Sequence, residues 1–255
     1  MDVYIPILAG LACGFINTVA SSGSALTLPL LIFMGLPPAV ANGTNRLPVL
    51  CASLIASITY VRSGVVDWKI LRFVLPPSLV GGLIGILIAD HIPEYFVKAL
   101  VTIAITIAFL LLFTKVKQAF ERVTEELPRC RWQEALYLFF VGLWMGLIVL
   151  DSATYLLLVM VMSMRLSLLK ANAYKNIILT FGMGLSLIIM TIDGNVNWEI
   201  GAIMAAGSVV GGYLGARFSF HQLAKVWTYR ILASMIGLEI VHISLKDILG
   251  VDLFM

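Results

Sequence analysis

Polar strings interrupt an otherwise apolar chain, and their residue types are those that bind anions. The string "ANGTNR" (41–46) sets an arginine among amide and hydroxyl side chains. An arginine offers a planar fork of N–H donors that matches the oxygens of a carboxylate, sulfonate or phosphate. The related string "ANAYKN" (171–176) adds a lysine. The candidate anion contacts in these two strings are Asn42, Thr44, Asn45, Arg46 and Lys175.

A third string, "NTVASSGSALTLP" (17–29), predicts a turn between two apolar runs. Its serines and glycine let the backbone reverse and leave amide N–H groups at the start of the next helix, where the helix dipole also favours an anion. The alternative is a notch of small residues for close helix packing, with the serines bonded back to the helix. The candidate contacts in this string are Asn17, Ser21, Ser22, Gly23 and Ser24.

A fourth break, "LIVLDSATYLLL" (147–158), places Asp151 beside Ser152. Asp151 is a candidate proton-coupling carboxylate, because an acid at membrane depth is usually functional. It can equally be the N-cap of the short helix that follows, and the two roles are compatible. Since an ionised Asp151 would repel an anion, we expect direct contact at the third string.

For Arg46, the alternative to anion binding is a side chain that snorkels to the outer headgroups. Two features favour the protein interior. The neighbouring side chains are also hydrogen-bond donors, and a cation recurs at Lys175 in the second string. Charged residues at membrane depth usually face the inside of a helix bundle.

The elements that must position these residues are membrane helices. Of the 255 residues, 60% are hydrophobic and 12% charged, with a mean hydropathy of +1.01, whereas soluble domains are about 25% charged. Apolar runs of about 17–25 residues that do not alternate predict a polytopic helical membrane protein and not a barrel. The net charge of +3 gives no reason to expect nucleic acid. The three cysteines have neither disulfide nor metal spacing, no cofactor is expected, and the start "MDVYIPILAG" lacks the basic region of a signal peptide.

The chain repeats itself at a spacing of 130 residues. "GVVDW" (64–68) returns as "GNVNW" (194–198), and "VGGLIG" (80–85) returns as "VGGYLG" (210–215). The order and common spacing predict two structural repeats, and on this spacing Lys175 aligns with Asn45, one place before the equivalent of Arg46. The apolar segments are 3–20, 24–35, 43–61, 70–89, 95–114, 134–150, 152–164, 172–192, 198–216 and 227–246.

Basic residues are distributed oppositely in the equivalent loops of the two halves. The loop 62–72 is basic, whereas its counterpart 192–199 carries only acids. The loop 217–230 is basic, whereas its counterpart 90–98 is mixed. By the positive-inside rule, the halves are inverted and each crosses an odd number of times. Both termini are then expected outside, with the polar centre of the chain (115–133) in the cytoplasm.

Two of the segments, 24–35 and 152–164, are too short to cross a bilayer. At a rise of about 1.5 Å per residue, about 12 residues cannot span about 30 Å. We interpret each as one arm of a hairpin whose tip turns within the membrane. The fold class is therefore all-α: a polytopic membrane protein of two inverted repeats, 1–127 and 128–255. Each repeat is a broken-helix (re-entrant) hairpin plus three transmembrane helices, and such matched interruptions point to a transport site.

The stretch "LTLPLLIFMGLPPAVANGTNRLPVL" (26–50), followed by "SGVVDW" (63–68), resembles the TauE/SafE family of sulfite exporters and toluene-sulfonate uptake proteins. The resemblance implies a bacterial or archaeal inner-membrane transporter that moves sulfite, sulfoacetate or related organic anions, generally outward. It carries over onto residues 42–46 and, by position, onto the serines of the third string. Two departures concern the substrate: "SSGS" stands where the family usually has a run of glycines, and Asp151-Ser152 stands where it usually has glycine and proline.

We therefore expect a secondary transporter that exports a small sulfur-containing anion, such as sulfite or sulfoacetate, by alternating access. Proton coupling through Asp151 is left open, and a passive anion channel is the alternative. An intramembrane enzyme is disfavoured, because the chain has no HExxH or GxSxG pattern. The expected partners are the anionic substrate and the lipid bilayer, with a homodimer left open.

Overall fold

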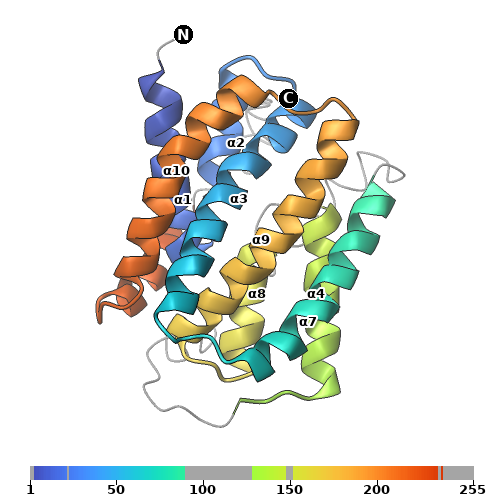
Figure 1. Cartoon of the computed structure of the whole chain (residues 1–255), viewed down its shortest axis with the longest axis vertical. Helices are drawn as coiled ribbons and strands as arrows, with labels where there is room; N and C mark the ends of the chain where they lie inside the picture. The colour runs from blue at the N-terminus through green and yellow to red at the C-terminus, as the bar shows by residue number, and fades with distance from the viewer. Residues whose placement is uncertain (1–2, 22, 90–127, 148–151, 235–236, 238–255) are drawn as a thin grey trace.

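The computed structural model describes residues 3–21, 23–89, 128–147, 152–234 and 237, and every regular element within these residues is helical (Figure 1). Four sequence predictions fall outside the described residues. They are the segment 95–114, most of the segment 227–246, and the site candidates Ser22 and Asp151.

The described helices follow the apolar segments of the sequence. The first half contains α1 (Tyr4–Ala20), α2 (Ser24–Phe33), α3 (Pro38–Arg62) and α4 (Trp68–Ala89). The second half contains α7 (Trp132–Leu147), α8 (Ser152–Leu158), the π-helix η1 (Val159–Ser163), α9 (Leu168–Ile192) and α10 (Trp198–Phe218). The predicted starts of α3 and α9, at 43 and 172, are wrong by several residues, because the polar strings are themselves helical.

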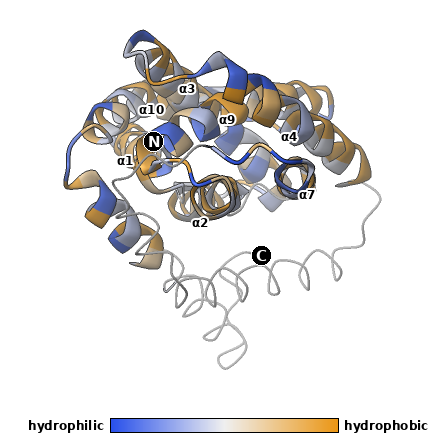
Figure 2. Ribbon diagram, turned by 90° about the horizontal axis from the view of Figure 1, so that it is seen from below, coloured by the Kyte–Doolittle hydropathy of each residue, from blue (hydrophilic) through white to orange (hydrophobic). Residues whose placement is uncertain are grey.

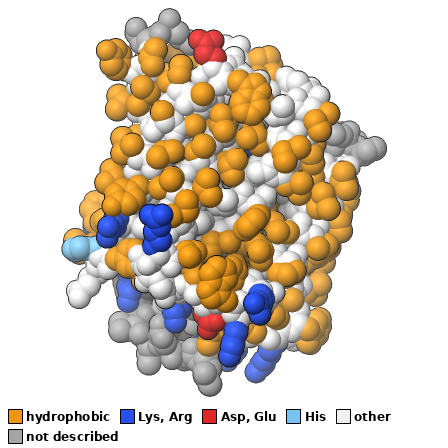
Figure 3. Space-filling view, viewed as in Figure 1, with side chains coloured by type: hydrophobic (Ala, Val, Ile, Leu, Met, Phe, Trp, Pro, Cys, Tyr) orange, Lys and Arg blue, Asp and Glu red, His pale blue; other side chains and the backbone are white. Residues whose placement is uncertain are grey.

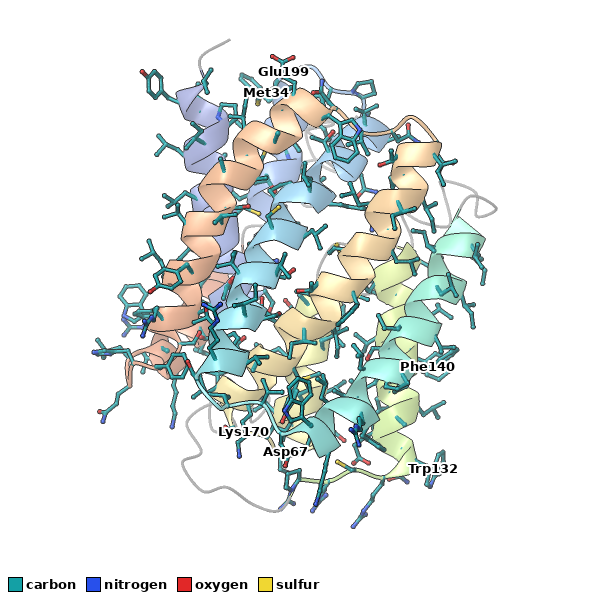
Figure 4. All side chains as sticks on the ribbon, in the orientation of Figure 1. Met34, Asp67, Trp132, Phe140, Lys170 and Glu199 are labelled. Carbon is teal, nitrogen blue, oxygen red and sulfur yellow. The ribbon has the colours of Figure 1, made fainter. Side chains whose placement is uncertain are left out.

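Three described helices are long and apolar enough to cross a membrane: Trp68–Ile88, Leu168–Ile192 and Trp198–Phe218. Helix α3 has 25 residues, which makes it about 37 Å long, and the polar string 41–46 lies in its first turns. Helix α2, with 10 residues, is about 15 Å long and too short to cross. Hydrophobic residues run along the helices (Figure 2). Large apolar side chains such as Leu87 and Phe140 are exposed, and Figure 4 shows Phe140 on the outer surface.

The two halves are interlocked. Helix α1 of the first half packs along α10 of the second, and α4 of the first half packs along α7 of the second. Glycines allow this close approach: a Cβ atom on Gly14 would overlap the carbonyl oxygen of Ser208, and one on Gly146 would overlap that of Gly82. Helices α3 and α9 pack against each other in the middle of the molecule (Figure 1).

Charge is concentrated at one end of the molecule. Lysine and arginine gather near the lower end in Figure 3. This is the end where Figure 4 labels Asp67 and Lys170, whereas Glu199 lies at the opposite end. Helix α1 begins at the end of Glu199 and runs towards the basic end (Figure 1).

Candidate functional site

The chain turns between α1 and α2, and the described residues of this turn, Ser21 and Gly23, are here called the first tip. Ser21 follows the last residue of α1 and has a left-handed backbone with φ of +76°. Gly23 lies directly on α1, because a Cβ atom there would overlap the carbonyl oxygen of Cys13. The turn predicted from the third polar string is therefore present, and it is packed against the helix that precedes it.

Lys175 is fully buried and holds the end of α1. Its Nζ atom donates to the carbonyl oxygens of Asn17 at 2.9 Å and Thr18 at 3.0 Å. It also donates to Ser21 Oγ at 3.0 Å and to Asn172 Oδ1 at 2.9 Å. The last carbonyls of a helix lack partners within it and form the negative end of its dipole. The ammonium supplies both a hydrogen-bond donor and the complementary charge.

The second half supplies further donors to the same helix end. The carbonyl oxygen of Val19 accepts from Asn172 Nδ2 at 3.4 Å and from Thr228 Oγ1 at 3.3 Å. Three consecutive carbonyls at the buried end of α1 are thus satisfied by side chains from the second half of the chain. Without such partners a buried helix end would be costly.

Asn45 holds the other side of the first tip, at the start of α2. Its Nδ2 donates to Ser24 Oγ at 3.1 Å, and its Oδ1 accepts from Thr27 Oγ1 at 2.6 Å. Gly23, the N-cap residue of α2, has no side chain with which to cap the helix. Asn45 and Lys175, which align in the sequence repeat, therefore contact α2 and α1 on either side of one turn.

Arg46 is 1% exposed, yet its Nε, Nη1 and Nη2 atoms have no hydrogen-bond partner among the described residues. Positions 46, 53 and 57 share one face of a helix. Ser53 and Ser57 form hydrogen bonds of 3.2 Å with Thr180 of α9. The side chain of Arg46 therefore leaves α3 on the face that packs against α9.

The remaining sequence candidates differ in position. The Oγ1 atom of Thr44 accepts a bond of 2.9 Å from the backbone N–H of Asn197, so it lies towards the start of α10. Asn42 is partly buried, one turn before Arg46. The structure thus places two hydrogen-bonded groups on either side of the first tip: Lys175 with the Asn17 carbonyl and Ser21, and Asn45 with Ser24.

Sequence reasoning missed several polar residues of this region. Hydrogen bonds at the two arms of the first hairpin, α1 and α2, involve Thr27, Thr228 and Asn172. Of these, only Asn172 could have been selected from the sequence, because it belongs to the string "ANAYKN". Besides Arg46, three residues have buried side-chain atoms without a partner in the described residues: Thr18 Oγ1, Thr154 Oγ1 and Asn176 Oδ1. No group of histidine, cysteine and acidic residues that could hold a metal occurs in the part of the chain that the structure describes.

Comparisons with known proteins identify relatives over almost the whole chain. The family model described as sulfite exporter TauE/SafE matches residues 6–242. A probable membrane transporter protein of Haemophilus influenzae is 29% identical over 222 residues, which cover 85% of this chain and 87% of that protein. The probable membrane transporter protein ORF9 of Sinorhizobium sp. is 27% identical, with coverage of 86% and 84%. The probable membrane transporter protein YfcA of Escherichia coli K12 is 25% identical, with coverage of 93% and 94%. No solved structure matches the chain.

Proposed function

We propose that this chain, which belongs to the TauE/SafE family, is a secondary transporter that carries a small sulfur-containing anion outward across the inner membrane. The observation that carries the proposal is Arg46, a buried arginine whose three nitrogen atoms have no partner among the described residues. A buried charge without a partner is costly. An oxyanion that accepts from the guanidinium fork would supply the missing partner.

The first tip gives the proposed site its second element. Helix α2 has 10 residues and its N-cap residue is a glycine, which offers no side-chain cap, and helix N-termini attract anions. Asn45 contacts Ser24, and Arg46 is the next residue of α3. We assign anion contact to Arg46 and to the start of α2, with Asn42 and Ser22 as further contacts that the sequence predicts.

Alternating access is proposed from the arrangement of the helices. Helices α1, α3 and α4 run opposite to α7, α9 and α10 respectively (Figure 1). The packing of α1 on α10 corresponds to that of α7 on α4 when the halves are exchanged. Both features are what two inverted repeats predict, and such repeats usually rock around a site between them. The positive-inside rule then puts the basic end in the cytoplasm and the start of α1 outside.

The test is flux into proteoliposomes of wild-type protein, Arg46→Ala and Arg62→Ala, with sulfite, sulfoacetate or taurine and an imposed pH gradient. Arg62 is an exposed arginine at the end of the same helix and serves as the matched control. We expect saturable flux of at least one anion in the wild type and in Arg62→Ala, and none in Arg46→Ala. Unchanged affinity in Arg46→Ala would remove Arg46 from the site, and flux that does not saturate would favour a channel.

Proton coupling is tested in the same vesicles with Asp151→Asn. If Asp151 carries the coupled proton, flux in this variant should no longer follow the pH gradient, because the amide cannot titrate. Flux that still follows the gradient would leave Asp151 with the role of a helix cap.

A further inference from the structure

We propose that Lys175 is a positioning residue that pins the first tip to the second half of the protein, and that it does not contact the transported anion. This assigns Lys175 a different part from the substrate contact predicted from the sequence. The proposal rests on the proposed function only in taking the first tip as part of the transport site.

The two buried cations of the central helices are in opposite situations. Lys175 has three N–H donors and four acceptors within 3.0 Å, all of them neutral protein groups. An anion could reach it only by displacing these bonds. Arg46 has no partner among the described residues. A cation whose donors are all bonded to protein groups is suited to a structural role. A cation without hydrogen-bond partners is suited to ligand binding.

The contacts of Lys175 connect segments that are far apart in the sequence. It lies 158 residues from Asn17, whose carbonyl it binds, and Asn172 of the same helix holds both the ammonium and the carbonyl of Val19. The start of α2 is held instead by Asn45, from the first half. The first tip is therefore hydrogen-bonded on its α1 side to Lys175 of the second half, and on its α2 side to Asn45 of the first half. Any movement of one half against the other must loosen one of these two attachments.

Cys13 is a native reporter for loosening of the first tip. Its side chain is completely buried, and its Sγ atom lies 3.7 Å from Thr27 Oγ1. Gly23 of the first tip lies on its backbone carbonyl. Because the chain contains only three cysteines, replacing Cys51 and Cys130 by serine leaves Cys13 as the single thiol.

The experiment measures the rate at which N-ethylmaleimide labels Cys13 in this single-cysteine protein, reconstituted without any substrate. The variants are Lys175→Met, Lys175→Arg and, as the control, Lys69→Met, which changes an exposed lysine in the first turn of α4. Lys175→Met should label about tenfold faster, because a methionine of similar length cannot donate to the α1 carbonyls. Lys175→Arg keeps the charge and should label more slowly than Lys175→Met, and Lys69→Met should match the starting protein.

Substrate measurements separate the two roles of Lys175. If the proposal holds, Lys175→Met keeps the half-saturating anion concentration within about twofold but loses maximal flux, as expected when positioning and not ground-state binding is removed. Unchanged Cys13 labelling together with lost anion binding would make Lys175 a substrate ligand and overturn the proposal. Unchanged labelling with unchanged flux would overturn it too.

A second variant covers the case in which Lys175→Met does not fold. Asn172→Leu removes one acceptor of the ammonium and one donor to Val19 while leaving Lys175 in place. This variant should also accelerate the labelling of Cys13. A labelling rate equal to that of the starting protein would refute the positioning role of Lys175. Since labelling needs no substrate, this result is readable even if the proposed anion is wrong.

Discussion

Replacing Arg46 by methionine should stabilise the substrate-free protein, which is the reverse of what a structural arginine would do. The guanidinium is buried and has no partner among the described residues. Replacing a buried ion pair by apolar residues of similar volume is often neutral or stabilising by about 1–4 kcal/mol, and a buried charge without a partner has no pair attraction to lose. With no hydrogen bond to lose, Arg46→Met should fall in the stabilising part of that range.

The same substitution should remove anion binding. An oxyanion held by the guanidinium fork makes two charge-assisted hydrogen bonds, each worth about 1.5–3 kcal/mol. Their loss, about 3–6 kcal/mol together, corresponds to a fall in affinity of roughly 10²- to 10⁴-fold. Stability and binding are thus expected to change in opposite directions.

The assay is the melting temperature of purified protein in detergent, with and without sulfite or sulfoacetate. A ligand that binds only the folded state raises the melting temperature. Arg46→Met should melt higher than wild type without anion and show no rise with it, whereas Arg62→Met, which changes an exposed arginine of the same helix, should leave both values near wild type. The reasoning is refuted if Arg46→Met melts lower without anion and still responds to it.

Three further predictions concern the first tip, the interlocked halves and the basic end. Ser21→Gly should leave the melting temperature almost unchanged, because relief of a left-handed backbone, worth about 1–3 kcal/mol, offsets the lost side-chain hydrogen bond. Ser21→Val keeps the strain, loses the bond and should melt lower. Gly207→Leu should reduce the free energy of unfolding by at least about 1–3 kcal/mol, measured by thermal unfolding, because even a Cβ atom there would overlap the backbone of α1. Partial burial and then the carboxylates of Glu134 and Asp67 raise the pKa of the Cys130 thiol. Since the thiolate is the reactive form, maleimide labelling of Cys130 as the single cysteine should be slow at neutral pH and still rise above pH 9. Asp67→Asn should shift that profile to lower pH, and an unshifted profile would count against the carboxylate effect.

The helices could be predicted from the sequence because apolar runs of membrane length have few alternative structures. The ends of α1 and α2 agree with the predicted segments to within two residues. The starts of α3 and α9 were predicted too late, since hydropathy stops at the polar strings. Those strings are helical, and several of their side chains find partners inside the protein, as Asn45 does in Ser24 and Thr27.

The candidate site was predicted only as far as local residue types allow. A turn of small residues and a buried arginine are local features, so the first tip and Arg46 could be identified from short strings. The partners of Lys175 could not, because the bonds from its ammonium to Asn17, Thr18 and Ser21 cross more than 150 residues of sequence. Two of its four acceptors are backbone carbonyls, which carry no residue-type signal. Thr228 likewise resembles any other threonine until the fold brings it to Val19.

Positions that align in the sequence repeat but carry different residue types locate the proposed anion site more sharply than positions that carry similar ones. Asn45 and Lys175, which align in the sequence repeat, both contact residues in or beside the first tip. One place further, Arg46 corresponds to Asn176, whose Oδ1 atom is also buried without a partner among the described residues. An equal pair at this position would give two cations that repel each other or two neutral amides that bind an anion weakly. With arginine at 46 and asparagine at the aligned position 176, this pair of positions carries one positive charge, and its guanidinium has no hydrogen-bond partner among the described residues. We therefore expect a single anion at Arg46.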